Sequence, residues 1–128
     1  MNYSFLIEKA REAMEYAYAP YSNFKVGAAL LTESGKIYTG CNIENISFGA
    51  TNCAERTAVF KAVSEGEKAF KAIAIVSSSG KFTPPCGICR QVLSEFSEDI
   101  DIILTDKDDN IKIIKLNELI PFSFDSIN

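Results

Sequence analysis

Residues 72–78 read AIAIVSS, a short apolar run that predicts a buried central strand. Before it, residues 53–65 predict a helix that stops at Gly66. After it, a proline-containing loop leads into a predicted helix over residues 87–96. A strand between two helices is typical of a sheet with helices packed on its faces. This stretch therefore predicts an α/β fold class.

The flanking segments extend the sheet in both directions. Residues 25–32 (KVGAALLT) predict a buried strand, and residues 36–43 (KIYTGCNI) return as its antiparallel partner. Residues 101–105 and 111–114 predict a second hairpin. We therefore expect a three-layer α/β/α sandwich with a mixed five-stranded sheet, parallel in its middle and antiparallel at both ends.

Two more helices are predicted near the chain ends. We expect Ser4 to cap a helix whose apolar residues recur at three- and four-residue spacing through Ala17, with Pro20 ending it. Residues 116–119 are expected to form a short helix. No repeat or low-complexity linker divides the sequence, so residues 1–128 are expected to form a single domain.

Composition weighs against several function classes. The chain has 13 Lys and Arg against 17 Asp and Glu, a net charge of −4, whereas nucleic-acid affinity depends on cationic contacts with phosphates. No stretch approaches the roughly 20 apolar residues that span a bilayer. Glu8 and Lys9 lie where a signal peptide would run apolar. We therefore expect a cytoplasmic protein with no nucleic-acid or membrane partner.

The absence of histidine narrows the chemistry further. It removes Ser–His and Cys–His nucleophile pairs and every histidine-ligated metal site. The four cysteines are Cys41, Cys53, Cys86 and Cys89. Because cytoplasmic thiols stay reduced, these residues predict metal ligands, reactive thiols or small core residues rather than two disulfides.

Three of the cysteines lie at predicted helix starts. Cys53 opens the helix before the central strand, and Cys86 and Cys89 bracket the start of the helix after it. Two parallel crossovers would bring both helix starts to one sheet edge, where the helix N-termini favour thiolates. Three thiolates can hold zinc and leave a fourth position open for water, as in catalytic sites. Cys41 is expected in mid-strand and therefore not as a fourth ligand.

Two residues beside Cys53 complete this candidate centre. A Glu55 carboxylate next to a metal-activated water can act as general base and then as general acid. Three thiolates and Zn²⁺ sum to −1, and Arg56 can offset that charge by donating hydrogen bonds to the sulfurs. Taken singly, these residues also fit plainer interpretations: a buried core cysteine, a Cys86–Cys89 redox pair or a solvated helix start.

Taken together, the Cys-x-Glu and Pro-Cys-x-x-Cys motifs form a specific pattern of zinc nucleobase deaminases. Residues 52–57 (NCAERT) and 85–91 (PCGICRQ) resemble the cytidine deaminase family in its small homotetrameric, all-cysteine form. The resemblance covers nearly the whole chain, including residues 19–24 (APYSNF), 26–30 (VGAAL) and 40–45 (GCNIEN). It implies one zinc ion per chain on the three helix-start cysteines, with the neighbouring glutamate shuttling protons and the arginine bonding the thiolates.

The resemblance also implies substrate-binding positions. Asn42 and Glu44 match a pair that binds the ribose hydroxyls, and residues two apart on a strand point to one face. The phenylalanine matching Phe24 packs by the base and sugar, and Ala54 belongs to the same set. On pattern alone, Asn42 and Glu44 would be a polar strand end and Phe24 a core residue.

The resemblance further implies a homotetramer with sites shared between subunits. The segment 121–124 (PFSF) matches the family's C-terminal motif. This makes Phe124 the candidate that stacks on the base from a neighbour. Phe122, which stands where glycine is common, is the other candidate. The almost wholly apolar run over residues 119–124 favours an interface; the alternative is that it folds over its own sheet.

The activity that the resemblance implies is zinc-dependent hydrolysis of cytidine and 2′-deoxycytidine to uridine and 2′-deoxyuridine, with release of ammonia, in pyrimidine salvage. The rivals are a deaminase of another cytosine nucleoside such as the antibiotic blasticidin S, a nucleic-acid-editing deaminase and a non-catalytic zinc-binding module. The segment 42–44 (NIE) favours plain ribose or deoxyribose. The acidic charge weighs against an editing enzyme. The turn over residues 106–110 also weighs against it, because this turn is too short for a parallel crossover, whereas the editing enzymes of the superfamily place their last two strands parallel.

Overall fold

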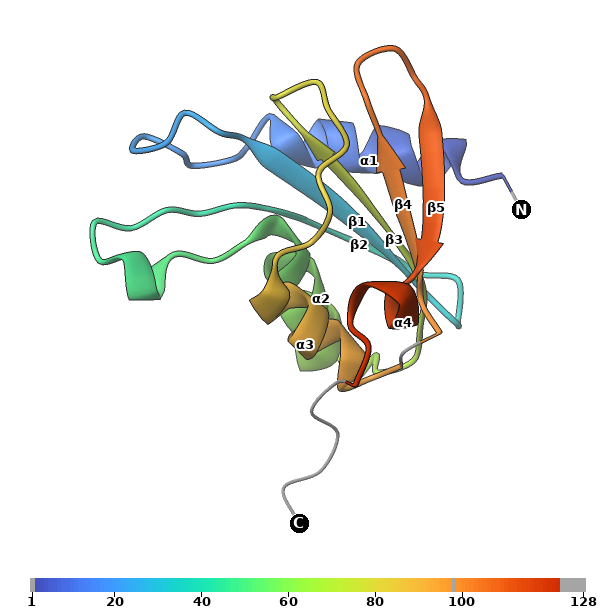
Figure 1. Cartoon of the computed structure of the whole chain (residues 1–128). Helices are drawn as coiled ribbons and strands as arrows, with labels where there is room; N and C mark the ends of the chain where they lie inside the picture. The colour runs from blue at the N-terminus through green and yellow to red at the C-terminus, as the bar shows by residue number, and fades with distance from the viewer. Residues whose placement is uncertain (1, 98, 123–128) are drawn as a thin grey trace.

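The computed structural model describes residues 2–97 and 99–122, and Figure 1 shows how their elements are arranged. The helices are α1 (Ser4–Met14), α2 (Ala54–Ser64), α3 (Gly87–Ser94) and α4 (Leu116–Leu119), with a single 3-10 turn, η1, over Phe48–Ala50. The strands are β1 (Val26–Thr32), β2 (Ile37–Cys41), β3 (Phe70–Ser77), β4 (Asp101–Thr105) and β5 (Ile111–Lys115). Each element predicted from the sequence therefore has a counterpart. The strand over residues 101–105 and the helix over residues 116–119 keep their predicted bounds, and the other elements differ at one or both ends.

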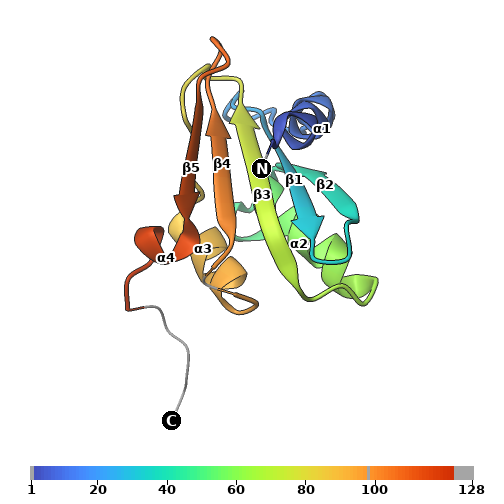
Figure 2. The ribbon, with the colours of Figure 1, turned by 90° about the vertical axis from the view of Figure 1, so that its right-hand side faces the viewer.

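The five strands form one sheet in the order β2-β1-β3-β4-β5, which Figure 2 shows side by side. Among these described strands, β3 and β4 are the one parallel pair, and the other three pairs are antiparallel. The expected parallel middle is therefore a single pair, because β1 runs against β3 as well as against β2. Since β2 and β3 both run against β1, they share a direction, and both β2–α2–β3 and β3–α3–β4 are parallel crossovers.

Helices cover both faces of the sheet, which confirms the expected three-layer sandwich (Figure 1). On one face, α1 packs its buried side chains Leu6, Ile7 and Ala10 against the sheet. On the other face, α2, α3 and α4 bury apolar side chains in a second, larger cluster. Within residues 2–97 and 99–122, no helix has both the length and the apolar character needed to cross a membrane.

The first helix differs from its prediction at both ends. Ser4 is the first helical residue rather than the cap, and the Asn2 side-chain oxygen accepts the hydrogen bond from its N–H at 2.9 Å. The helix ends at Met14, before the apolar spacing ends at Ala17. The reason is tertiary, because Tyr18 forms a β-bridge just beyond the end of β2.

Candidate active site

Two helix starts meet at the sheet edge where β2 and β3 end. Both helices follow strands that run in the same direction, so their N-termini lie at the same edge. Cys53 is the N-cap residue of α2 and Cys86 is the N-cap residue of α3, each with an extended backbone. Cys89 lies three residues after Cys86 and therefore shares its side of the helix.

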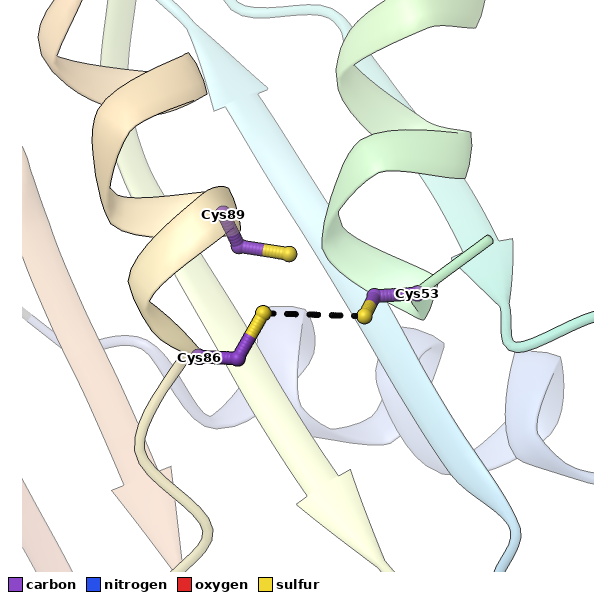
Figure 3. A group of neighbouring side chains, drawn as sticks. All are labelled: Cys53, Cys86 and Cys89. Atoms are coloured by element: carbon purple, nitrogen blue, oxygen red, sulfur yellow. Dashed lines mark hydrogen bonds between the residues drawn. The ribbon is translucent and has the colours of Figure 1, made fainter. Parts of the chain in front are cut away.

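The sulfur atoms of these three cysteines converge (Figure 3). They lie within 4.8 Å of one another, and the Cys53 and Cys86 sulfurs are 3.7 Å apart. Tetrahedral zinc, with Zn–S distances of about 2.3 Å, holds its sulfurs about 3.8 Å apart. The donor set and its spacing therefore fit a zinc ion. Cys41 does not join this group; it is the last residue of β2 rather than a mid-strand residue.

Arg56 faces the cysteine cluster from α2. Its Nη2 donates a hydrogen bond to Cys53 Sγ at 3.2 Å. A hydrogen bond with Cys89, followed by the one with Arg56, lowers the pKa of Cys53 to about 5. The lowered pKa favours the thiolate form of Cys53, which is the form that binds metal. Within the described residues, the buried Nε of Arg56 has no hydrogen-bond partner.

Glu55 is the second residue of α2 and is almost fully buried, with 5% of its surface exposed. It lines a cavity of about 240 Å³ together with Cys53 and Cys86. Burial and then the nearby charge of Cys53 raise the pKa of the Glu55 carboxyl to about 7. A carboxyl group with that pKa can both accept and donate a proton near neutral pH.

Phe24, Asn42 and Ala54 line the same cavity. Phe24 is 38% exposed, so its plainer interpretation as a core residue is wrong. A larger cavity of about 460 Å³ lies between α1 and the ends of β3 and β4, away from the cysteines. The smaller cavity is the candidate site, because titratable groups and a metal-ligand set converge there.

Asn42 holds the backbone of the loop that carries Phe24. Its Nδ2 donates to the Phe24 carbonyl oxygen at 2.7 Å, and its Oδ1 accepts from the Val26 N–H at 2.9 Å. Asn42 is only 7% exposed. Its side chain therefore shapes one wall of the cavity in addition to lining it.

Glu44 holds the same loop from its other end. Its Oε1 accepts hydrogen bonds from the Tyr21 and Ser22 N–H groups at 3.0 and 3.1 Å, and the Ser22 hydroxyl donates to its Oε2. Hydrogen bonds from Ser22, and then from the Tyr21 backbone, lower the pKa of Glu44. Glu44 lines a separate hollow of about 180 Å³ that shares Thr51 with the main cavity.

Several lining residues were not predicted as site residues: Thr51, Asn52, Thr83 and Pro84. Thr83 and Pro84 directly precede the Pro-Cys motif, and that adjacency was a usable signal. No comparable signal in the sequence links Tyr21 and Ser22 to Glu44.

Two C-terminal phenylalanines, Phe122 and Phe124, are the candidates for the aromatic side chain that stacks on the base. Phe124 lies outside the described residues. Phe122 is fully exposed and has a φ of 56°. This left-handed conformation favours glycine, which agrees with the glycine that is common at this position in the family that the sequence resembles.

Comparisons with known proteins agree with this geometry. The family model described as "Cytidine and deoxycytidylate deaminase zinc-binding region" matches residues 1–104. A cytidine deaminase of Sporosarcina psychrophila is 49% identical over 125 residues, covering 97% of this chain and 92% of that protein. One from Halalkalibacterium halodurans is also 49% identical over 125 residues, covering 97% of this chain and 95% of that protein.

A solved structure supports the fold independently. The crystal structure of cytidine deaminase from Burkholderia pseudomallei superposes with a TM-score of 0.92 at 46% sequence identity. The match covers 97% of this chain and 100% of that one. With the zinc-binding region, the converging cysteines and these relatives in agreement, the chain belongs to the cytidine deaminase family.

Proposed function

We propose that the protein hydrolyses cytidine and 2′-deoxycytidine to uridine and 2′-deoxyuridine and releases ammonia. The observation that carries this proposal is the environment of Glu55, a buried carboxyl with a pKa of about 7 in the same cavity as two converging sulfurs. The names of the relatives support the same activity. Residues 1–128 form a single catalytic domain in this proposal.

The metal-binding residues are Cys53, Cys86 and Cys89, which together hold one zinc ion per chain. Zinc, when bound, supplies Lewis-acid activation of the attacking water near neutral pH. Arg56 donates to the Cys53 sulfur and so offsets the excess negative charge of three thiolates.

Glu55 moves two protons in sequence. It accepts one from the attacking water and delivers it to N3 of the pyrimidine as the water oxygen bonds to C4. It then takes the remaining proton from that oxygen and gives it to the amino group. The C4–N4 bond breaks and ammonia leaves, so one water is consumed for each ammonia released. A pKa near 7 suits a group that must alternate between base and acid.

The nucleoside-binding residues are Phe24, Asn42, Glu44 and Ala54. The base lies in the main cavity, against Phe24 and the start of α2, and the sugar extends toward Glu44. A carboxylate offers about four acceptor positions, and loop donors occupy three of those on Glu44. The remaining position accepts a sugar hydroxyl. Asn42 retains one Nδ2 hydrogen, which donates to a sugar oxygen.

The active form is a cytoplasmic homotetramer that works in pyrimidine salvage and binds no nucleic acid or membrane. Ile46 and Phe48 support an interface, because they lie two residues apart in one loop, each is more than 80% exposed, and neighbouring exposed apolar side chains mark association sites. Phe124 stacks on the base in a neighbouring subunit's site. Light scattering at assay concentration should give the mass of four chains, and a fully active monomer would contradict this assembly.

Turnover of purified, zinc-loaded protein tests the activity. The ultraviolet absorbance of cytidine and of 2′-deoxycytidine should fall, with one ammonia released per nucleoside converted. Blasticidin S at the same concentration should be turned over much more slowly. No ammonia from either nucleoside would favour a non-catalytic zinc module, and preferred turnover of blasticidin S would favour the antibiotic deaminase.

A further inference from the structure

Strand β2 and helix α2 touch backbone to backbone at Gly40. A Cβ atom at this position would lie 2.5 Å from the carbonyl oxygen of Ala54 and 2.6 Å from the amide nitrogen of Ala58. Since real side chains do not fit at such distances, the helix approaches the strand as closely as the backbones permit. Small shifts of α2 along β2 therefore change the site directly, because the first turn of α2 carries Glu55.

The hydroxyl of Thr57 bridges the two elements at this contact. It donates to the carbonyl oxygen of Cys41, the last residue of β2, at 3.0 Å. It also lies 3.1 Å from the Cys53 carbonyl oxygen and accepts a hydrogen bond from Asn52 Nδ2 at 3.2 Å. The single hydroxyl proton is shared between these two carbonyl oxygens, and the Cys53 contact is the usual helical one to the carbonyl four residues earlier. The bond to Cys41 instead leaves the helix and reaches the neighbouring strand.

The groups that this hydroxyl joins lie next to the two halves of the site. Cys41 directly precedes Asn42, which lines the cavity. Asn52 directly precedes Cys53, one of the three converging cysteines. One hydroxyl therefore connects the strand end that faces the nucleoside with the helix start that faces the metal.

We propose that Thr57 is a positioning residue that sets the distance between these two halves. This inference rests on the proposed function, since it assigns Asn42 to the nucleoside and Glu55 to proton transfer. Thr57 is not among the residues that line the cavity, so it acts through its neighbours. A misplacement of about 1 Å, even from a change remote from the chemistry, can cost about 10²-fold in rate.

The decisive variant is Thr57→Val, which keeps the β-branched shape and removes the hydroxyl. We expect kcat/KM for cytidine to fall about 10- to 100-fold, with a higher KM and a lower kcat, because both halves of the site move. Zinc content should stay near one per chain, but zinc should pass to a chromophoric chelator several-fold faster. Thr57→Ser keeps the hydroxyl and should restore kcat/KM to within about threefold of the wild type.

Ser64→Ala is the matched control within α2. The Ser64 hydroxyl donates to the Lys61 carbonyl oxygen at 2.7 Å, a local helical bond near the end of the helix. This variant should leave kcat, KM and the zinc-release rate unchanged. If Thr57→Val does not fold, Thr57→Ala takes its place, because alanine has the highest helix propensity.

Wild-type kinetics and zinc release in the hydroxyl-free variant would overturn the proposal. The same kinetic loss in Thr57→Ser would also overturn it, because packing of the methyl group rather than the hydroxyl would then be responsible. The wild-type holoenzyme is assayed in parallel. If the wild type itself releases no ammonia, the proposed function fails; if the wild type is active and the variants match it, this inference alone fails.

Discussion

Two carboxylates at the same edge of the sheet have opposite environments. Glu55, at the start of α2, is buried, and burial raises its pKa to about 7. Glu44, just beyond the end of β2, is only half-buried, and hydrogen bonds from Ser22 and the Tyr21 backbone lower its pKa. Two adjoining hollows, which share Thr51, therefore contain a carboxyl suited to moving protons and another held as an anion. The environment of each group, rather than its residue type, decides which task it performs.

The largest expected effect comes from removing a metal ligand at the helix starts. Cys53→Ala, Cys86→Ala and Cys89→Ala should each lower zinc content well below one per chain and abolish measurable turnover, since metal binding is coupled to local folding. Metal analysis and the absorbance assay on the same samples check this.

Cys41→Ala is the matched control for the ligand variants. Its sulfur does not belong to the converging group, so about one zinc per chain and normal turnover should remain. Stoichiometric loss of zinc in Cys41→Ala would instead indicate a closed site with four cysteines.

Glu44→Gln tests whether the charge of Glu44, at the end of β2, contributes to substrate binding. It keeps the size of the side chain and removes the charge that accepts the loop and sugar hydrogen bonds. Hydrogen bonds to charged groups are worth about 1.5–3 kcal/mol, so KM for cytidine should rise about 10- to 100-fold with a smaller change in kcat.

Glu67→Gln provides the control for Glu44→Gln. Glu67 also accepts a hydrogen bond from a serine hydroxyl, that of Ser34, which lowers its pKa. It lies in the segment between α2 and β3, away from the cavity, so its replacement should leave KM unchanged. A fall in kcat with constant KM in Glu44→Gln would assign Glu44 to the chemical step and contradict its role as a substrate-binding anion.

The helix-start half of this site could be predicted from sequence. Cys53, Cys86 and Cys89 converge because both helices follow strands of one direction, and that relation is readable from alternating helices and strands. Glu55 and Arg56 are then placed by their positions in the first turn of α2. Local spacing together with one topological rule was enough for this half.

The strand-end half could not be predicted in the same way. Glu44 bonds to Tyr21 and Ser22, more than 20 residues earlier, and no spacing rule connects such distant positions. The antiparallel pairing of β1 with β3 and the early end of α1 at Met14 were missed for the same reason. Each depends on contacts between segments that meet only in the folded chain.

The smallest expected effect concerns Asp101, a third carboxylate, at the start of β4 and outside the cavity. Although burial acts to raise its pKa, hydrogen bonds from Lys115 and Tyr3 lower it below its ordinary value. A lowered pKa in the folded state stabilises the protein above the unfolded pKa of about 4. That contribution is lost as the pH falls through the lower, folded value.

Denaturant unfolding of wild type and Asp101→Asn between pH 3 and 7 measures this contribution. The difference in the free energy of unfolding should be largest near neutral pH and should shrink as the pH falls below about 4. Taking the difference between the two proteins removes the common effect of acid on the cysteine cluster. A difference that stays constant over this range would mean that the Asp101 charge contributes nothing, which would weaken the same reasoning for Glu44.

We infer that Glu55 transfers protons and is not a metal ligand, and kcat of Glu55→Gln at a measured zinc content decides both points. Glutamine keeps the size of the side chain and cannot accept the proton. We expect about one zinc per chain and a kcat for cytidine at least about 10³-fold below that of the wild type, at the upper end for a general acid–base group. A zinc-loaded variant with kcat within tenfold of the wild type, or a variant that has lost its zinc, would contradict the claim.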